Sequence, residues 1–273
     1  MSDPEVAVHP SATVHPDAEL DRGVSVGPGS VISARVKIGK NTQLSAHCYI
    51  EGDTEIGSDC LLSPHVTIGT PPQDLGYQGE PTRVIIGNRN SFREFFTCHR
   101  ATIKDRGETV IGDDNYFMAY THVAHDCIVG DHTVMVNNSS LGGHVEVHDY
   151  AFLSALSAVH QFCRVGKYAL VGGGSIVIQD ILPFCRFAGA RPLLFYGINS
   201  IGLRREGFSR DQIRVVKEAV SIIFDPLVNT TQALQKIEKD LPATAEREEI
   251  LDFVRKSKRG IAKKQDDTWM SSE

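Results

Sequence analysis

The middle of the chain is unusually rich in histidine, the side chain best suited to acid–base chemistry near neutral pH. Six of them fall close together: His122, His125, His132, His144, His148 and His160. Several imidazoles in one place could bind zinc, or one histidine could act as a general base if a carboxylate orients it. His125 is followed directly by Asp126, so this dipeptide carries both groups that general-base catalysis needs.

The spacing of these residues favours the general base over a metal site. His122 and His125 are separated by two residues, and on a strand that spacing directs the two side chains to opposite faces. We therefore predict no metal. Gly143 could present an unobstructed backbone N–H to a developing oxyanion. The side chains of His125 and Asp126 can meet if the chain turns a corner there.

The elements that position these residues follow a period of six. Every sixth residue is apolar from Val8 to Ile68, then at Ile86, Phe92 and Cys98, and again from Ile111 to Val177. Neither a helix nor a simple strand has this period. A triangular coil does, with one short strand and one corner per hexapeptide and an inner apolar column. Glycine often follows the apolar residue, which predicts unusual dihedral angles at the corners.

This pattern predicts a mainly β fold for residues 1–190, a parallel β-helix of roughly nine coils and ~40 Å in length. Because three hexapeptides make one turn of about 18 residues, residues one turn apart lie side by side. We therefore expect one patch, within roughly 10 Å, that contains His125, Gly143, His144, His160 and Gln161. Isolated corner histidines are usually structural, but the clustering here favours a functional site.

Two segments interrupt the period, residues 74–85 and 104–110. Insertions in solenoids leave the coil as loops and often lie on the binding face. Tolerated surface loops are nevertheless the more common case, so loops without a function are the starting expectation.

After Pro183 the pattern becomes helical, and residues 191–273 are predicted to form a small α-helical domain with a polar tail. Such a domain would cover the open end of the coil. Capping residues predict three helix starts, at Ser209 with Gln212, at Asn229 with Gln232, and at Thr244. The corresponding ends are predicted near Pro226, Leu241 and Gly260.

Bulk properties exclude several classes of protein. The net charge of −6 over 273 residues does not favour nucleic-acid binding. The six cysteines form no Cys-x-x-Cys pair, which argues against a zinc or redox motif and fits a reducing compartment. The first residues lack a basic and apolar leader, and no apolar run reaches ~18 residues. We therefore expect a cytoplasmic protein without a membrane span.

Several separate blocks resemble the UDP-N-acetylglucosamine O-acyltransferase family, and the resemblance covers nearly the whole chain. The most specific blocks are Gln73-Asp74-Leu75, Gly79-Glu80-Pro81-Thr82-Arg83, His99-Arg100, His122-Val-Ala-His125-Asp126-Cys127, Ala158-Val-His160-Gln161-Phe162, Gly197-Ile-Asn199, Gly202-Leu-Arg-Arg205 and Gly207-Phe-Ser209. The resemblance implies a left-handed β-helix, a homotrimer with sites between subunits, and the first step of lipid A biosynthesis. In that reaction an (R)-3-hydroxyacyl chain passes from the phosphopantetheine of acyl carrier protein to the 3-position of UDP-N-acetylglucosamine, without a further cofactor.

The resemblance also implies roles for individual residues. His125 would be the general base, Asp126 its partner, and the Gly143 amide the oxyanion donor. Substrate contacts are implied for Gln73, Asp74, His122, His144, His160, Gln161, Asn199, Arg204 and Arg205. Gly173, expected near the His125 patch, would measure acyl length. The chain departs from the family at Gly76, where a lysine is usual, and at Glu206, where a basic residue is frequent, and both departures predict a weaker hold on the nucleotide phosphates.

Two alternatives remain open from the sequence. One is a sister acyltransferase that acts on an amine later in the same pathway, which carries an extra N-terminal uridine-binding domain, whereas the repeats here begin at Val8. The other is a β-helix that serves as a scaffold without catalysis. For the carrier protein, the basic segment 255–264 is the best candidate docking surface, since a small acidic partner needs a local positive patch.

Overall fold

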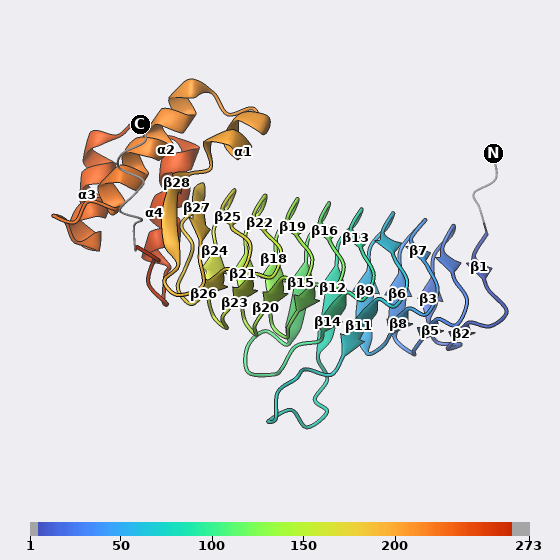
Figure 1. Cartoon of the computed structure of the whole chain (residues 1–273). Coiled ribbons are helices and arrows are strands. Elements are labelled where there is room, and N and C mark those ends of the chain that lie inside the picture. The colour runs from blue at the N-terminus through green and yellow to red at the C-terminus, as the bar shows by residue number, and fades with distance from the viewer. Residues whose placement is uncertain (1–4, 264–273) are drawn as a thin grey trace.

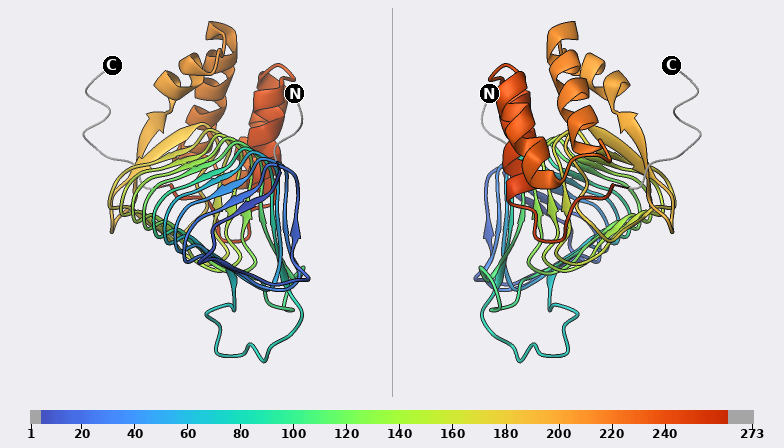
Figure 2. Two further views of the ribbon diagram at one scale, coloured as in Figure 1. Left: turned by 90° about the vertical axis from the view of Figure 1, so that its right-hand side faces the viewer. Right: turned by 90° about the vertical axis from the view of Figure 1, so that its left-hand side faces the viewer.

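The computed structural model describes residues 5–263, and it shows a three-sided coil of parallel strands with helices at one end (Figure 1). Up to β26 (Ile176–Val177), each strand pairs in parallel with the strand three positions along the chain, so every turn of the coil contributes one strand to each of three sheets. Viewed along its axis, the coil is triangular (Figure 2). The hexapeptide period therefore predicted the architecture correctly.

The first sheet, sheet A, ends with two longer strands that pair with each other in the antiparallel sense. Its strands are β1 (Ala7–Val8), β4 (Ser25–Val26), β7 (Gln43–Leu44), β10 (Leu61–Leu62), β13 (Ser91–Phe92), β16 (Tyr116–Phe117), β19 (Val134–Met135), β22 (Phe152–Leu153), β25 (Leu170–Val171), β27 (Cys185–Ala188) and β28 (Leu194–Ile198).

Sheets B and C form the other two sides of the coil. Sheet B contains β2 (Thr13–Val14), β5 (Val31–Ile32), β8 (Tyr49–Ile50), β11 (Thr67–Thr70), β14 (Thr97–His99), β17 (His122–Val123), β20 (Ser140–Leu141), β23 (Ala158–Val159) and β26 (Ile176–Val177). Sheet C contains β3 (Glu19–Leu20), β6 (Val36–Ile38), β9 (Asp53–Ile56), β12 (Arg83–Ile86), β15 (Glu108–Ile111), β18 (Ile128–Val129), β21 (Glu146–Val147) and β24 (Arg164–Val165).

The apolar residue of each hexapeptide points into the coil, as expected. From Val26 to Val177 every member of the series is buried, and together these residues form a continuous core. In the first turn, Val8 is 44% exposed, and Val14 and Leu20 are half-buried, because no earlier coil covers that end.

The glycines that follow the apolar residues have a different role from the one expected. At Gly57, a Cβ atom would lie 2.5 Å from the carbonyl oxygen of Gly87 in the next coil, and Gly39 and Gly27 are crowded in the same way. The backbone φ of these three glycines is not positive. Glycine is therefore required by the close approach of successive coils, and the prediction of unusual dihedral angles was wrong for these positions.

The unusual dihedral angles occur two residues further on, at the corners themselves. Non-glycine residues such as Asp126 and His144 have a φ of about 61° there, in the left-handed region. Where these corner residues are aromatic, their rings stack from coil to coil, as in the series His132, Tyr150, Tyr168 and Phe184. Stacked side chains stabilise a backbone conformation that L-residues otherwise disfavour.

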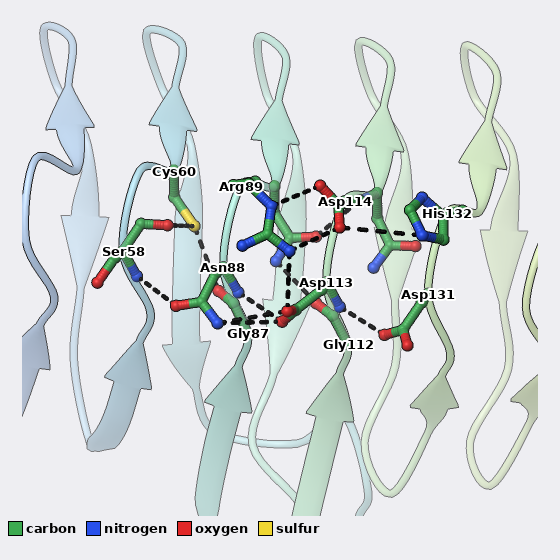
Figure 3. Close-up of polar contacts among 12 residues, drawn as sticks. Ser58, Cys60, Gly87, Asn88, Arg89, Gly112, Asp113, Asp114, Asp131 and His132 are labelled. Atoms are coloured by element: carbon green, nitrogen blue, oxygen red, sulfur yellow. Dashed lines mark hydrogen bonds and ion pairs between the residues drawn. The ribbon is translucent and has the colours of Figure 1, made fainter.

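Polar side chains tie successive coils together at the corner between sheets C and A (Figure 3). The Asn88 side chain accepts a hydrogen bond from the Ser58 N–H at 2.9 Å, and Asp113 and Asp131 repeat this contact one coil further on each time. The Arg89 guanidinium donates to both Asp113 and Asp114. The bonds accepted by Asn88, Asp113 and Asp131 satisfy backbone N–H groups that the short strands leave unpaired.

Both insertions leave the coil at the corner between sheets B and C, and Figure 1 shows them projecting from the same side. They are shorter than predicted, since residues 83–85 belong to β12 and residues 108–110 to β15. The predicted domain boundary also shifts, because β28 extends sheet A before the first helix begins.

The C-terminal part packs its helices against the last coils. They are α1 (Ser200–Arg205), α2 (Arg210–Ile223), α3 (Thr230–Asp240) and α4 (Ala245–Arg255). The capping boxes at Ser209 and Asn229 and the cap at Thr244 are confirmed. The sequence did not predict α1, and α4 ends at Arg255 rather than near Gly260. Within residues 5–263, no helix is both long and apolar enough to cross a membrane.

The close stacking of coils generates a stability prediction. Gly57→Ala should lower the free energy of unfolding by about 1–3 kcal/mol, as overpacking does in a tight interior, because its methyl group would overlap the Gly87 carbonyl. Gly173→Ala is the matched control, since its Cβ would meet one atom, the Ala155 oxygen, at 3.4 Å. Denaturant unfolding of both variants checks this. Equal stability of the two would contradict the packing argument.

Candidate active site

A groove of about 500 Å³ runs over the corner between sheets B and C and onto the face of sheet B. It is lined by residues from successive coils: Gln73, His122, Ala124, His125, Ser140, Leu141, Gly142, Gly143, Ala158, Val159, His160 and Gln161. His125, Gly143, His160 and Gln161 therefore lie together, as the coil length predicted.

His125 and Asp126 meet at the corner. The Nδ1 atom of His125 is 2.8 Å from Oδ2 of Asp126, and the Asp126 side chain is completely buried. Adjacent side chains face each other here because Asp126 has a left-handed φ of 61°. Since Nδ1 donates to the carboxylate, the imidazole is oriented and its Nε2 is left as the proton acceptor.

Three donors converge on the Asp126 carboxylate. Besides His125, the backbone N–H and the hydroxyl of Thr102 donate to Oδ2 at 3.0 and 2.8 Å. Burial alone would raise the pKa of Asp126, but the hydrogen bonds from His125 and Thr102 outweigh it and lower the pKa. Asp126 is therefore held as an anion that can stabilise a positive charge on His125.

Gly143 lies directly against the His125 ring. A Cβ atom at this position would be 2.5 Å from Cε1 and 2.7 Å from Nε2 of His125, so glycine is needed for the approach. Among residues 5–263 the Gly143 N–H has no hydrogen-bond acceptor, whereas its carbonyl accepts from Phe162. A free amide beside the basic nitrogen is suited to bind a developing oxyanion.

The neighbouring histidines are fixed by their surroundings. The His144 ring packs edge-on against His125 at 5.3 Å and is stacked on Phe162. His122 is hydrogen-bonded to Thr97 through Nδ1 at 2.7 Å. Burial, and then the charge of His125, lowers the pKa of His122, and burial lowers the pKa of His99 to about 4. The His122 and His99 rings are therefore neutral at neutral pH and can serve as hydrogen-bonding groups.

His125, Asp126 and His144 also have ligand atoms within 4.8 Å of one another, close enough to surround a metal ion. However, Oδ2 of Asp126 already accepts three hydrogen bonds, and His125 directs Nδ1 to it. The arrangement favours a hydrogen-bonded acid–base pair.

Other predicted site residues lie away from the groove within one chain. Asn199 caps α1, where its side chain accepts from Gly202 and donates to the Tyr168 carbonyl. Arg204 and Arg205 are exposed in the last turn of α1, and Glu206 caps its end. Tyr168 belongs to the corner between sheets C and A, and Figure 1 shows α1 on the side of the molecule opposite the two insertions.

Gly173 was expected near the His125 patch, but the structure separates the two. It lies at the corner between sheets A and B, next to Ala155, so the width of sheet B separates it from His125. The outward-facing residues in between are small, Ser140 and Ala158. The φ of Gly173 is not positive, in contrast to Gly174, so the corner itself does not require glycine at this position.

The sequence did not reveal that residues in and just before the second insertion contact the site. Thr102 contacts Asp126, and Asp105 lies 3.7 Å from Nδ1 of His144. The side chain of Arg106 reaches the Asp126 carbonyl. Their separation from these partners differs from one coil length because the insertion shifts the frame, so the repeat could not align them. Near the other end of the groove, Arg259 lies 3.3 Å from Nδ1 of His160.

A histidine backed by a buried carboxylate and a free backbone amide, on a coil of hexapeptides, fits a hexapeptide-repeat transferase. The family described as bacterial transferase hexapeptide matches residues 35–70 and 108–143. The second domain of UDP-N-acetylglucosamine O-acyltransferase matches residues 180–262.

Whole-chain relatives identify the family. The acyl-[acyl-carrier-protein]–UDP-N-acetylglucosamine O-acyltransferase of Thermodesulfovibrio yellowstonii is 48% identical over 94% of this chain and 99% of its own. The enzyme of the same name from Halorhodospira halophila is 46% identical over 93% and 98%. The crystal structure of UDP-N-acetylglucosamine acyltransferase from Bacteroides fragilis matches with a TM-score of 0.90 and 39% identity, over 93% of this chain and 98% of that chain. The chain belongs to the UDP-N-acetylglucosamine O-acyltransferase family.

Proposed function

We propose that this protein transfers an (R)-3-hydroxyacyl chain from acyl carrier protein to the 3-position of UDP-N-acetylglucosamine, the first step of lipid A biosynthesis. The observation that carries the mechanism is the His125–Asp126 pair beside the free amide of Gly143. The near-complete coverage of relatives with this activity favours it over the later N-acyltransferase and over a scaffold.

In the proposed mechanism, each step is carried by one atom of the chain. Nε2 of His125 takes the proton of the acceptor hydroxyl as its oxygen attacks the thioester carbonyl. Asp126 stabilises the imidazolium that forms, and the Gly143 N–H donates to the oxyanion of the tetrahedral intermediate. When the carbon–sulfur bond breaks, the imidazolium returns the proton to the departing thiolate, which leaves as the phosphopantetheine thiol.

We further propose a homotrimer of left-handed β-helices in the cytoplasm. The placement of Asn199, Arg204 and Arg205 away from the groove supports the assembly, because α1 of a neighbouring subunit could then complete the acceptor site. The buried free thiols, among them Cys98 and Cys127, fit a reducing compartment.

The general-base role predicts a large loss of turnover in one variant. His125→Ala should lower kcat by at least ~10²-fold, the usual contribution of a general base, with an unchanged circular dichroism spectrum. Turnover is measured with hydroxyacyl carrier protein and UDP-N-acetylglucosamine. His132→Ala is the matched control, since this histidine stacks on Tyr150 at a different corner. Near-normal activity of His125→Ala would contradict the general-base mechanism.

The open space at Gly173 predicts a change in donor preference. With no side chain there, the groove across sheet B accepts longer acyl chains, so Gly173→Met should shift preference to shorter donors. Gly173→Ala should produce a smaller shift in the same direction because it fills less space. Competition between donors of different length gives the profile. An unchanged profile in the methionine variant would exclude Gly173 as the length-measuring residue.

The basic segment 255–264 remains a proposed docking surface for the carrier protein, although several of its charges have partners. Arg255 pairs with Glu238, and Lys256 pairs with Asp252 at 2.8 Å. Lys264 lies outside the described residues. Arg164, an alternative docking residue, is unsuitable because it is 12% exposed and covers the Phe253 ring.

Reversing Arg255, Lys256 and Lys258 to Glu should raise KM for the carrier-linked donor and weaken its salt dependence, since docking charges act on association and are screened by salt. KM for the nucleotide sugar should stay constant. The control Lys37→Glu, far along the coil, should change neither constant. If the triple variant also leaves both constants unchanged, the carrier protein docks elsewhere.

A further inference from the structure

The two insertions touch each other beside the candidate active site. Lys104 in the second insertion forms an ion pair with Asp74 in the first, with 2.5 Å between Nζ and Oδ2. The neighbouring residues of the second insertion, Asp105 and Arg106, approach His144 and Asp126. Lys104 is therefore positioned by the same loop that holds the acid–base pair.

Lys104 occupies the space beside Gly76. A Cβ atom at Gly76 would lie 3.4 Å from Nζ of Lys104 and 3.2 Å from Oδ1 of Asp74. A side chain at position 76 would therefore begin directly beside the Lys104 ammonium. The charge missing at position 76 is present, but it comes from the other loop.

The electrostatics of this corner require a cation when an anionic substrate approaches. Lys104, followed by the Gly76 N–H, lowers the pKa of Asp74, so that carboxylate is ionised at neutral pH. The Gln78 N–H lowers the pKa of Glu80 most, and the charge of Lys104 contributes to the same shift. The two carboxylates of the first insertion, one of which follows Gln73 of the groove, would repel a diphosphate in the absence of a neutralising charge.

Lys104 has donors available for a ligand. An ammonium group has three N–H donors, and one of them faces Asp74. The Lys104 side chain is 57% exposed, whereas Asp74 is 18% exposed, so the ammonium lies on the solvent side of the pair. Gln73, the residue next to Asp74, lines the groove itself.

We propose that Lys104 is a substrate-binding residue that supplies the positive charge for the diphosphate of the acceptor, in place of a side chain at position 76. This inference rests on the proposed function, which makes a nucleoside diphosphate sugar the acceptor. Asp74, held by the same ammonium, is then kept ionised next to the bound acceptor. The second insertion therefore binds substrate as well as orienting Asp126.

The test is the Lys104→Gln variant, which keeps a polar side chain, one atom shorter, but removes its charge. KM for UDP-N-acetylglucosamine should rise about 10-fold or more, as expected for a lost hydrogen bond to a charged group, with little change in kcat. Inhibition by UDP should weaken in parallel, whereas inhibition by uridine, which lacks phosphates, should not change. KM for the carrier-linked donor should stay constant.

A second-site variant separates a lost charge from a disturbed loop. Adding Gly76→Lys to Lys104→Gln should restore the affinity for UDP, because the φ of Gly76 is not positive and the shorter glutamine at position 104 vacates the place of the ammonium group beside Gly76. The control Lys37→Gln removes a lysine that faces Glu19 on sheet C and should leave every constant unchanged.

The outcomes distinguish this inference from the proposed function. Unchanged KM and UDP inhibition in Lys104→Gln would overturn the role of Lys104 while leaving the transferase intact. A fall in kcat alone, without rescue by Gly76→Lys, would mean that the loop acts through Asp126 instead, which also overturns it. If the wild-type protein does not acylate UDP-N-acetylglucosamine, the proposed function itself is wrong.

Discussion

The stacking of one narrow coil directly upon the next is the constraint on which the rest of this structure depends. Strands of two residues leave little backbone to form a sheet, so the coils must approach closely along their whole perimeter. The Cβ of any residue in place of Gly57 would overlap the carbonyl of the next coil. The same close approach brings Gly143 against the His125 ring, so the requirement that shapes the fold also builds the site.

The backbone geometry at the corners allows neighbouring side chains to meet. On a regular strand, consecutive side chains point to opposite faces, and a histidine could not meet the carboxylate that follows it. The left-handed φ of Asp126 removes that restriction and turns its carboxylate toward Nδ1 of His125. Elsewhere the same geometry holds stacked rings, such as Tyr150 on Tyr168, which have no partner of this kind. The acid–base pair is thus one of many equivalent corners, with different side chains.

The sequence predicted what the repeat controls and failed where the repeat is interrupted. Because the coil length is constant after Ile111, simple counting placed Gly143 and Gln161 beside His125. The contacts of Thr102 could not be found in this way, since the insertion alters its distance from Asp126 along the chain. Gly173 was misplaced although the same counting excludes it. It follows His125 by 48 residues, which is two turns of about 18 residues plus two further hexapeptides, so it lies at another corner of the coil.

The interactions of Asn199 leave room for the substrate contact that we propose for it in a homotrimer. Its amide oxygen accepts from the Gly202 N–H and its amide nitrogen donates to the Tyr168 carbonyl, so the side chain is fixed at both ends. An amide group has a second lone pair and a second N–H, and these remain for another molecule. Because the side chain is already ordered, a ligand that binds to them loses less conformational entropy than it would with a free side chain. Capping α1 and contacting an acceptor in a neighbouring subunit are therefore compatible roles.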